Sequence, residues 1–153
     1  MDEAQTVNVE QLEERRQTVR NKFHTLLETR TETLALFSSL IGMRPFKPEA
    51  DVQMVLQEFC ESLVDYSASA HFQLYSYIES DQERRTPVLE LAGQYYPRIA
   101  KTTRLILEFN EKYESEERSG DLANLDQELA VLGEALAERI QYEDKIIRAM
   151  STR

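Results

Sequence analysis

The chain has 153 residues and a formal net charge of −10, and at this size a single domain can bury a substantial core. The negative charge argues against direct nucleic-acid binding, because contacts with phosphate need clustered lysine and arginine. With only four glycines and four prolines, and with many good helix formers, the composition predicts an all-α protein. We expect one helical domain over residues 1–153, frayed over residues 1–8.

The N-terminus begins Met1-Asp2-Glu3-Ala4-Gln5 and lacks the basic start and apolar run of a secretion signal. No apolar stretch approaches the roughly 18 residues that are needed to span a bilayer. Cys60 is the single cysteine, so an internal disulfide is excluded. These features predict a cytoplasmic protein that makes no membrane contact, and we expect it to be a monomer.

The first predicted helix runs from about Val9 to Ile41, where apolar side chains recur at helical spacing. Gly42 and Pro45 follow it and form a strong stop signal. The expected apolar stripe consists of Leu12, Val19, Phe23, Leu26, Leu27, Leu34, Phe37, Leu40 and Ile41.

The second predicted helix opens at Pro48, with Glu49 and Asp51 suited to a helix N-terminus. Its apolar stripe consists of Val52, Val55, Leu56, Phe59, Leu63, Tyr66, Ala70, Leu74, Tyr77 and Ile78. Between Lys47 and Arg84 the sequence contains neither lysine nor arginine. The resulting negative potential favours encounter with a basic partner, although a solvated acidic face that serves solubility is the alternative.

The small-residue run at 67–70 lets another helix approach closely, and we expect Gly133 to meet Ala70 there. A candidate partner-binding patch then lies on the opposite face, with aromatic side chains and an acidic rim. Its members are Glu61, Asp65, Ala68, Phe72 and Tyr75. Aromatic anchors beside charge are typical of helix-binding surfaces, but aromatics at helical spacing are more often part of a core.

The third predicted helix has Thr86 as its N-cap and extends to about Tyr113. Pro97 lies inside it and is expected to kink it, because the ring removes a hydrogen bond and crowds the carbonyl of Gly93. We expect Asp121 to cap the fourth helix. Its stripe consists of Leu122, Leu125, Leu129, Leu132, Leu136, Ile140, Ile147 and Met150. Four such helices hide their stripes most simply as an antiparallel four-helix bundle.

Several charged residues fall on or beside these stripes, and buried charges must be paired. We predict an interior ion network that fixes the helix register. Its members are Arg30, Glu134, Arg139, Glu143 and Asp144.

The sequence offers little for catalysis or for metal binding. A di-iron site needs paired Glu-x-x-His motifs, whereas the only histidines are His24 and His71, neither with a glutamate three residues before it. Cys60 lies beside the apolar stripe, where cysteine usually acts as a small buried hydrophobe. Glycine-rich phosphate loops and acid–base pairs are also lacking. We therefore expect no enzyme activity, no cofactor and no metal.

Three blocks of sequence resemble the signature of the Rsd/AlgQ family of anti-sigma factors, and they follow one another along the chain in the same order as in that family. The first is Phe59-Cys60-Glu61-Ser62-Leu63-Val64-Asp65-Tyr66, followed by Ser69-Ala70-His71-Phe72 and Tyr75. The second is Leu132-Gly133-Glu134-Ala135-Leu136, then Glu138-Arg139-Ile140 and Glu143-Asp144-Lys145-Ile146-Ile147. The third runs from Arg30 to Leu34 and on to Leu40-Ile41-Gly42-Met43-Arg44-Pro45, and Tyr96-Pro97 is similar to a family aromatic-proline pair.

The resemblance implies a helical bundle that binds region 4 of the primary sigma factor of RNA polymerase and blocks recognition of the −35 promoter element. It also implies that Asp65, Ala68 and Phe72 belong to the sigma-facing surface, although family members usually have serine where this chain has Ala68. The alternative is a signalling adaptor for another regulatory protein, such as an alarmone enzyme or a phosphocarrier. Histidine phosphotransfer through His71 is a weaker alternative.

Overall fold

The computed structural model describes residues 9–11, 13–14, 21–79, 85–115 and 121–151, and these residues form no strand. The prediction of an all-α protein is therefore confirmed for this part of the chain. After short helical stretches at 9–11 and 13–14, the elements are α2 (His24–Ile41), α3 (Ala50–Ala70), the π-helix η1 (His71–Tyr75), α4 (Ser76–Glu79), α5 (Thr86–Tyr113) and α6 (Leu125–Ser151).

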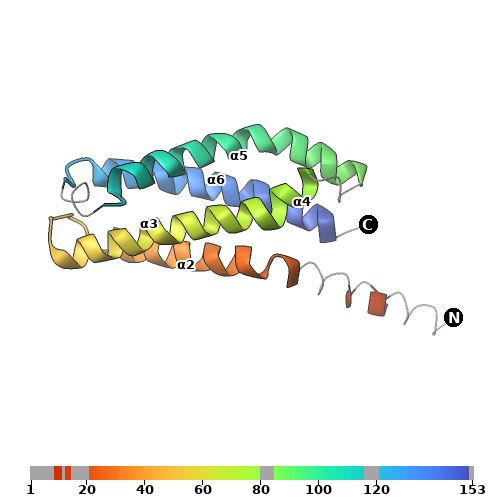
Figure 1. The fold of residues 1–153 in the computed structure, drawn as a ribbon, viewed down its shortest axis with the longest axis horizontal. Coiled ribbons are helices and arrows are strands. Elements are labelled where there is room, and N and C mark those ends of the chain that lie inside the picture. The colour runs from red at the N-terminus through yellow and green to blue at the C-terminus, as the bar shows by residue number, and fades with distance from the viewer. Residues whose placement is uncertain (1–8, 12, 15–20, 80–84, 116–120, 152–153) are drawn as a thin grey trace.

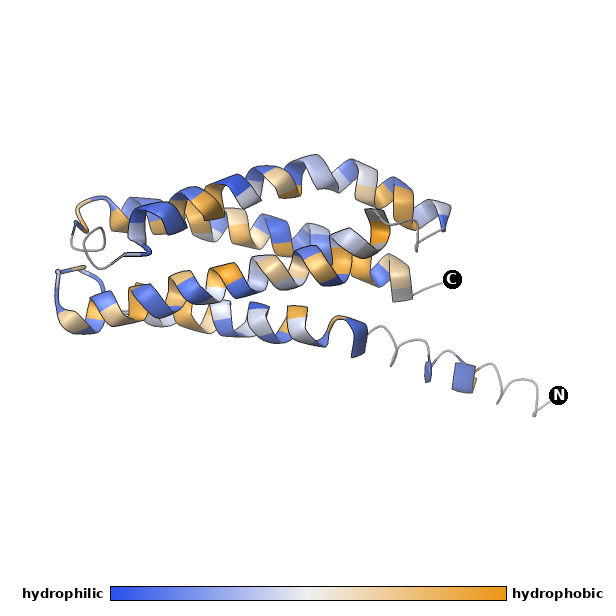
Figure 2. Ribbon diagram, in the orientation of Figure 1, coloured by the Kyte–Doolittle hydropathy of each residue, from blue (hydrophilic) through white to orange (hydrophobic). Residues whose placement is uncertain are grey.

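The four long helices lie side by side (Figure 1). The connection between α2 and α3 lies at one end of the molecule, together with the end of α5 and the start of α6. The starts of α2 and α5 and the end of α6 lie at the other end. Hydrophobic and hydrophilic residues interchange along every helix (Figure 2), as amphipathic helices around a shared core require. None of the described helices is long and apolar enough to cross a membrane.

The apolar stripe of α3 was predicted well. Its members are buried or half-buried wherever the structure describes their side chains, and Phe59, Leu63 and Tyr66 are completely enclosed. Phe59 contacts Phe37 of α2 at 5.9 Å and Phe109 of α5 at 5.7 Å between ring centroids. These three rings join three helices within the core.

The stripe of α2 differs from the prediction at Leu34, which is 39% exposed. The core positions instead follow a spacing of three and four residues through Arg30 and Thr33, both of which are buried. The hydroxyl of Thr33 lies 2.7 Å from that of Ser62 on α3, so this polar side chain is satisfied inside the core. Leu12 and Val19 lie outside the described residues.

Two helix starts differ from the predictions. Thr86 was predicted as the N-cap of α5, but it is the first residue of the helix, and Arg85 occupies the N-cap position. Asp121 does not cap α6, which begins at Leu125; its carboxylate instead accepts the N–H of Ala123 at 3.3 Å in the turn before the helix. Pro97 lies inside α5, and the kink there stays a prediction.

Gly133 of α6 faces Phe37 of α2. The prediction that Gly133 would meet Ala70 of α3 was wrong. A Cβ atom added at Gly133 would lie 2.8 Å from Cζ of the Phe37 ring, which is closer than real contacts allow. Glycine at this position therefore makes room for an aromatic ring of the neighbouring helix.

Candidate partner-binding face and buried polar network

Four of the predicted partner-binding residues lie on the exposed side of α3 and η1. Glu61, Asp65 and Ala68 are exposed on α3, and Phe72 in η1 is 72% exposed. The spacing of four and three residues places the three α3 side chains along one face of that helix. The outer face, as we name it below, consists of Glu61, Asp65, Ala68 and Phe72.

The outer face combines negative charge with apolar surface. Asp51 and Glu58 are exposed on the same helix, and so are the apolar side chains of Met54 and Val64. The His71 ring packs edge-on against Phe72, with 5.1 Å between their centroids. An exposed aromatic ring beside carboxylates suits a partner that has basic and apolar groups close together.

Tyr75, the fifth predicted residue, lies elsewhere. Its side chain is only 9% exposed, and its hydroxyl donates a 2.7 Å hydrogen bond to Oε2 of Glu143. Its ring also packs edge-on against Tyr96. Burial and the neighbouring Glu143 both raise the pKa of Tyr75, so the hydroxyl keeps its proton and acts as a donor.

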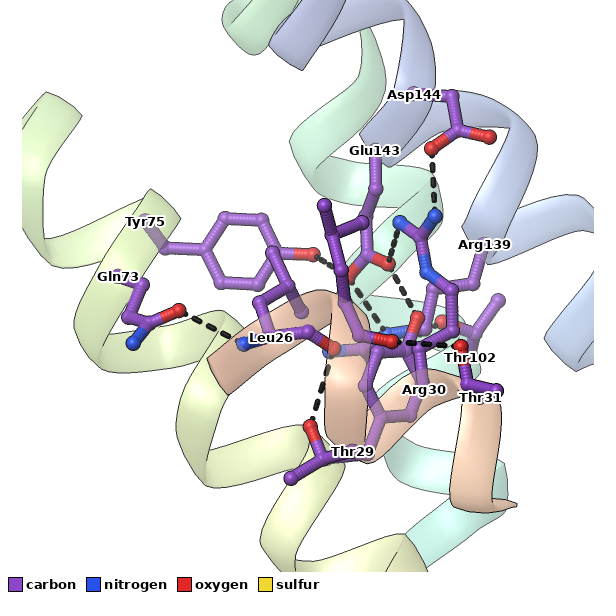
Figure 3. A network of polar contacts seen from close by, with 12 residues as sticks. Leu26, Thr29, Arg30, Thr31, Gln73, Tyr75, Thr102, Arg139, Glu143 and Asp144 are labelled. Atoms are coloured by element: carbon purple, nitrogen blue, oxygen red, sulfur yellow. Dashed lines mark hydrogen bonds and ion pairs between the residues drawn. The ribbon is translucent and has the colours of Figure 1, made fainter. Parts of the chain in front are cut away.

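Glu143 is fully buried and accepts hydrogen bonds from four side chains (Figure 3). The guanidinium groups of Arg30 and Arg139 each lie 3.2 Å from one of its oxygens. The hydroxyls of Tyr66 and Tyr75 supply the other two bonds. One carboxylate on α6 is thus bonded by α2, α3, η1 and its own helix.

The two arginines make further contacts that extend the network. Arg30 donates to Asp144 at 2.7 Å. Arg139 donates to the hydroxyls of Thr103 at 2.6 Å and Thr102 at 3.4 Å on α5. Its guanidinium also lies 5.4 Å from the ring centroid of Tyr66 and 5.8 Å from that of Tyr75. Buried charges are tolerated when they are paired and hydrogen-bonded in this way.

Four of the five residues predicted for the ion network therefore come together: Arg30, Arg139, Glu143 and Asp144. Glu134 is an exposed residue of α6, and none of the contacts above involves it. Sequence reasoning missed Tyr66 and Tyr75 as members of the network. Their hydroxyls carry no periodic signal that separates them from other aromatic core residues.

The two histidines lie at the surface of the described structure. His24 pairs with Glu28 at 3.1 Å, and His71 packs against Phe72. Among the described residues, no group of three or more histidine, cysteine, aspartate and glutamate side chains is placed to hold a metal ion.

Cys60 is buried in α3, and its thiol should react slowly in the native protein. Burial, together with Glu114 and Glu61, raises the pKa of the thiol from 9.0 to about 12, which at pH 8 leaves roughly a thousandfold less thiolate. We expect alkylation by iodoacetamide, followed by mass spectrometry, to be slow in buffer and to reach the rate of a free thiol in 6 M guanidinium chloride. Equal rates under both conditions would contradict this burial.

Comparison with known proteins identifies the family. The family described as "Regulator of RNA polymerase sigma(70) subunit, Rsd/AlgQ" matches residues 6–151. The chain is 32% identical over 126 residues to a protein named "Regulator of sigma D" from Yersinia enterocolitica, covering 80% of this chain and 75% of that protein. It is 33% identical over 125 residues to a protein of the same name from Enterobacter sp., covering 79% and 74%. No solved structure matches the chain significantly. With nearly its whole length matched, this chain belongs to the Rsd/AlgQ family of regulators of the RNA polymerase sigma(70) subunit.

Proposed function

We propose that this protein is an anti-sigma factor that binds region 4 of the primary sigma factor through its outer face and blocks recognition of the −35 element. Membership of the Rsd/AlgQ family and the name "Regulator of sigma D" of its relatives support regulation of this sigma factor.

We also propose that the four long helices form one antiparallel four-helix bundle, with α5 bent at Pro97. In such a bundle each helix turns one side to the core and leaves the other free for a partner. The free side of α3 carries the outer face. The protein is proposed to act in the cytoplasm as a monomer, without cofactor or catalytic step and without touching nucleic acid itself.

The observation that carries the proposal is the exposed acidic and apolar surface of α3, in a segment without a lysine or arginine from residue 48 to 83. Region 4 reads promoter DNA with a basic helix-turn-helix, whose cations meet phosphate groups. Asp65 and Glu61 offer those cations carboxylates in place of phosphates. The protein and −35 DNA should therefore exclude each other on region 4.

Phe72 supplies the apolar part of the proposed contact. It is the most exposed of the large hydrophobic residues in the described structure, at 72%. Ala68 lies four residues before it and is also exposed. Aromatic residues that become buried on binding commonly dominate the affinity of an interface.

The test is a displacement experiment with isolated region 4 bound to a fluorescent −35 duplex. We expect the wild-type protein to release the DNA and Asp65→Arg to need roughly tenfold higher concentration, because reversing a charge at the centre of the contact costs about 1–2 kcal/mol. Circular dichroism should show unchanged helicity for this variant.

The matched control is Glu134→Arg, which changes the net charge equally at an exposed position on α6. It should displace DNA like the wild type, which separates a local contact from a long-range charge effect. Equal displacement by Asp65→Arg would remove Asp65 from the interface. A ternary complex that holds DNA, region 4 and this protein together would overturn the proposed block.

A further inference from the structure

The π-helix η1 interrupts the run of helix from Ala50 to Glu79 just where the outer face ends. Before it, buried positions alternate by four and three residues through Leu56, Phe59, Leu63 and Tyr66. After Tyr66 one row of buried positions advances by four residues at each step, and Tyr75 is buried beside it. The positions of this row are Tyr66, Ala70, Leu74 and Ile78. In a regular α-helix each step of four residues overshoots a full turn by about 40°, so the stripe would rotate away from the core. The wider π-helical turn absorbs this rotation.

A regular helix would place Tyr75 differently. It lies three residues after Phe72 and seven after Ala68, which are spacings that share one face of an α-helix. Uninterrupted α-helix would therefore put Tyr75 on the exposed side with Asp65, as the periodicity of the sequence predicts. In the structure Tyr75 is buried and bonded to Glu143 instead. The π-turn separates Tyr75 from the outer face while Phe72 stays on it.

Two side chains of η1 tie it to neighbouring helices, Gln73 to α2 and Tyr75 to α6 (Figure 3). The hydroxyl of Tyr75 donates to Glu143 on α6 at 2.7 Å. The side-chain oxygen of Gln73 accepts the backbone N–H of Leu26 on α2 at 2.8 Å. Leu26 lies in the first turn of α2, where N–H groups have no partner within the helix, so Gln73 also satisfies an otherwise orphaned donor.

Phe72 directly precedes Gln73 and has no comparable tie to the core, since it is 72% exposed and packs against His71. Its place on the outer face therefore depends on the backbone that carries it. A π-helix is rare, occurs mostly as a single turn inside an α-helix, and persists where the surrounding structure holds it. The contacts of Gln73 and Tyr75 provide that support.

We propose that Gln73 and Tyr75 are positioning residues for partner binding: they hold the π-turn that presents Phe72 and keeps the Tyr75 ring off the outer face. This inference rests on the proposed function, because it assigns Phe72 to the contact with region 4. If Gln73 and Tyr75 act in this way, the buried hydrogen bonds around Glu143 influence the affinity of the outer face without contacting the partner.

The chain offers a matched pair of variants for the test. Tyr66→Phe and Tyr75→Phe each remove one hydroxyl donor to Glu143, but Tyr66 lies in regular α3 and Tyr75 in the π-turn. We expect similar losses of stability in urea titrations. The affinity for isolated region 4, measured by calorimetry well below the melting temperature, should fall roughly fivefold for Tyr75→Phe only. Amide hydrogen exchange over residues 71–76 should become faster in the same variant only.

Gln73 gives a second and milder test. Gln73→Glu keeps an acceptor for the Leu26 N–H and places a negative charge at a helix N-terminus, where it is favourable. Gln73→Met has a similar length but no such acceptor. We expect Gln73→Glu to retain the affinity for region 4 and Gln73→Met to lose it together with protection of the 71–76 amides.

Phe72→Ala distinguishes failure of this inference from failure of the proposed function. If Phe72→Ala weakens binding while Tyr75→Phe and Tyr66→Phe remain equal in affinity and in exchange, the positioning role is overturned. If neither Phe72→Ala nor Asp65→Arg weakens binding, the outer face is not the site, and the assignment of Gln73 and Tyr75 to partner binding falls with it.

Discussion

Glu143→Leu is expected to lower the free energy of unfolding by about 3–5 kcal/mol, because the variant leaves two buried arginines without their shared carboxylate. Arg139 is 1% exposed and Arg30 is 8% exposed, so neither guanidinium can recover its hydration unless the helices around it separate. The hydroxyls of Tyr66 and Tyr75 lose their acceptor in the same variant. The loss should appear in urea titrations followed by circular dichroism, as a lower midpoint with an unchanged slope.

Glu134→Leu is the matched control, since it makes the same substitution at an exposed site of the same helix and should change stability by less than about 0.5 kcal/mol. Adding Arg139→Leu to Glu143→Leu should recover part of the loss, because one unpaired buried charge disappears with it. Arg30 would still be paired with Asp144 at 2.7 Å. A double variant less stable than Glu143→Leu alone would show that Arg139 contributes chiefly through other contacts.

Phe59→Ala is expected to cost about 3–5 kcal/mol, the usual range for deleting a buried phenylalanine ring. Phe59 is completely buried and joins the rings of Phe37 and Phe109 from two other helices, so the neighbours cannot easily close the space left behind. Thermal unfolding followed by calorimetry measures the effect. Val64→Ala, at a 51% exposed position of the same helix, should stay near wild-type stability. A loss below about 1 kcal/mol for Phe59→Ala would mean that the core repacks around the gap.

The buried face of a helix could be predicted from the sequence where that face consists of apolar side chains alone. The stripe of α3 and the first half of that of α6 follow directly from the spacing of leucine and aromatic residues. In the second half of α6 the same spacing of three and four residues continues through Arg139 and Glu143 to Ile146, all of which are buried. The predicted stripe was built from apolar residues alone and therefore included Ile140 and Ile147, which are half-buried.

The position of Tyr75 could not be read from helical periodicity, because a single π-turn changes the phase of every residue that follows it. The succession of four-residue steps from Tyr66 to Ile78 is the signal that could have revealed it. The start of α6 was misplaced for a different reason. An aspartate accepts from backbone N–H groups in a turn as readily as at a helix N-terminus, so the residue type of Asp121 does not distinguish the two.

The residues that donate hydrogen bonds to Glu143 lie at widely separated positions in the chain, and these positions affect folding during synthesis. Arg30, Tyr66 and Tyr75 are synthesised long before their common acceptor, which lies on α6, the last of the described helices. Until α6 has emerged from the ribosome, a nascent chain has no partner for these polar groups and gains little by closing its earlier helices tightly around them. Emergence of α6 thus becomes a condition for tight packing of the earlier helices around these groups.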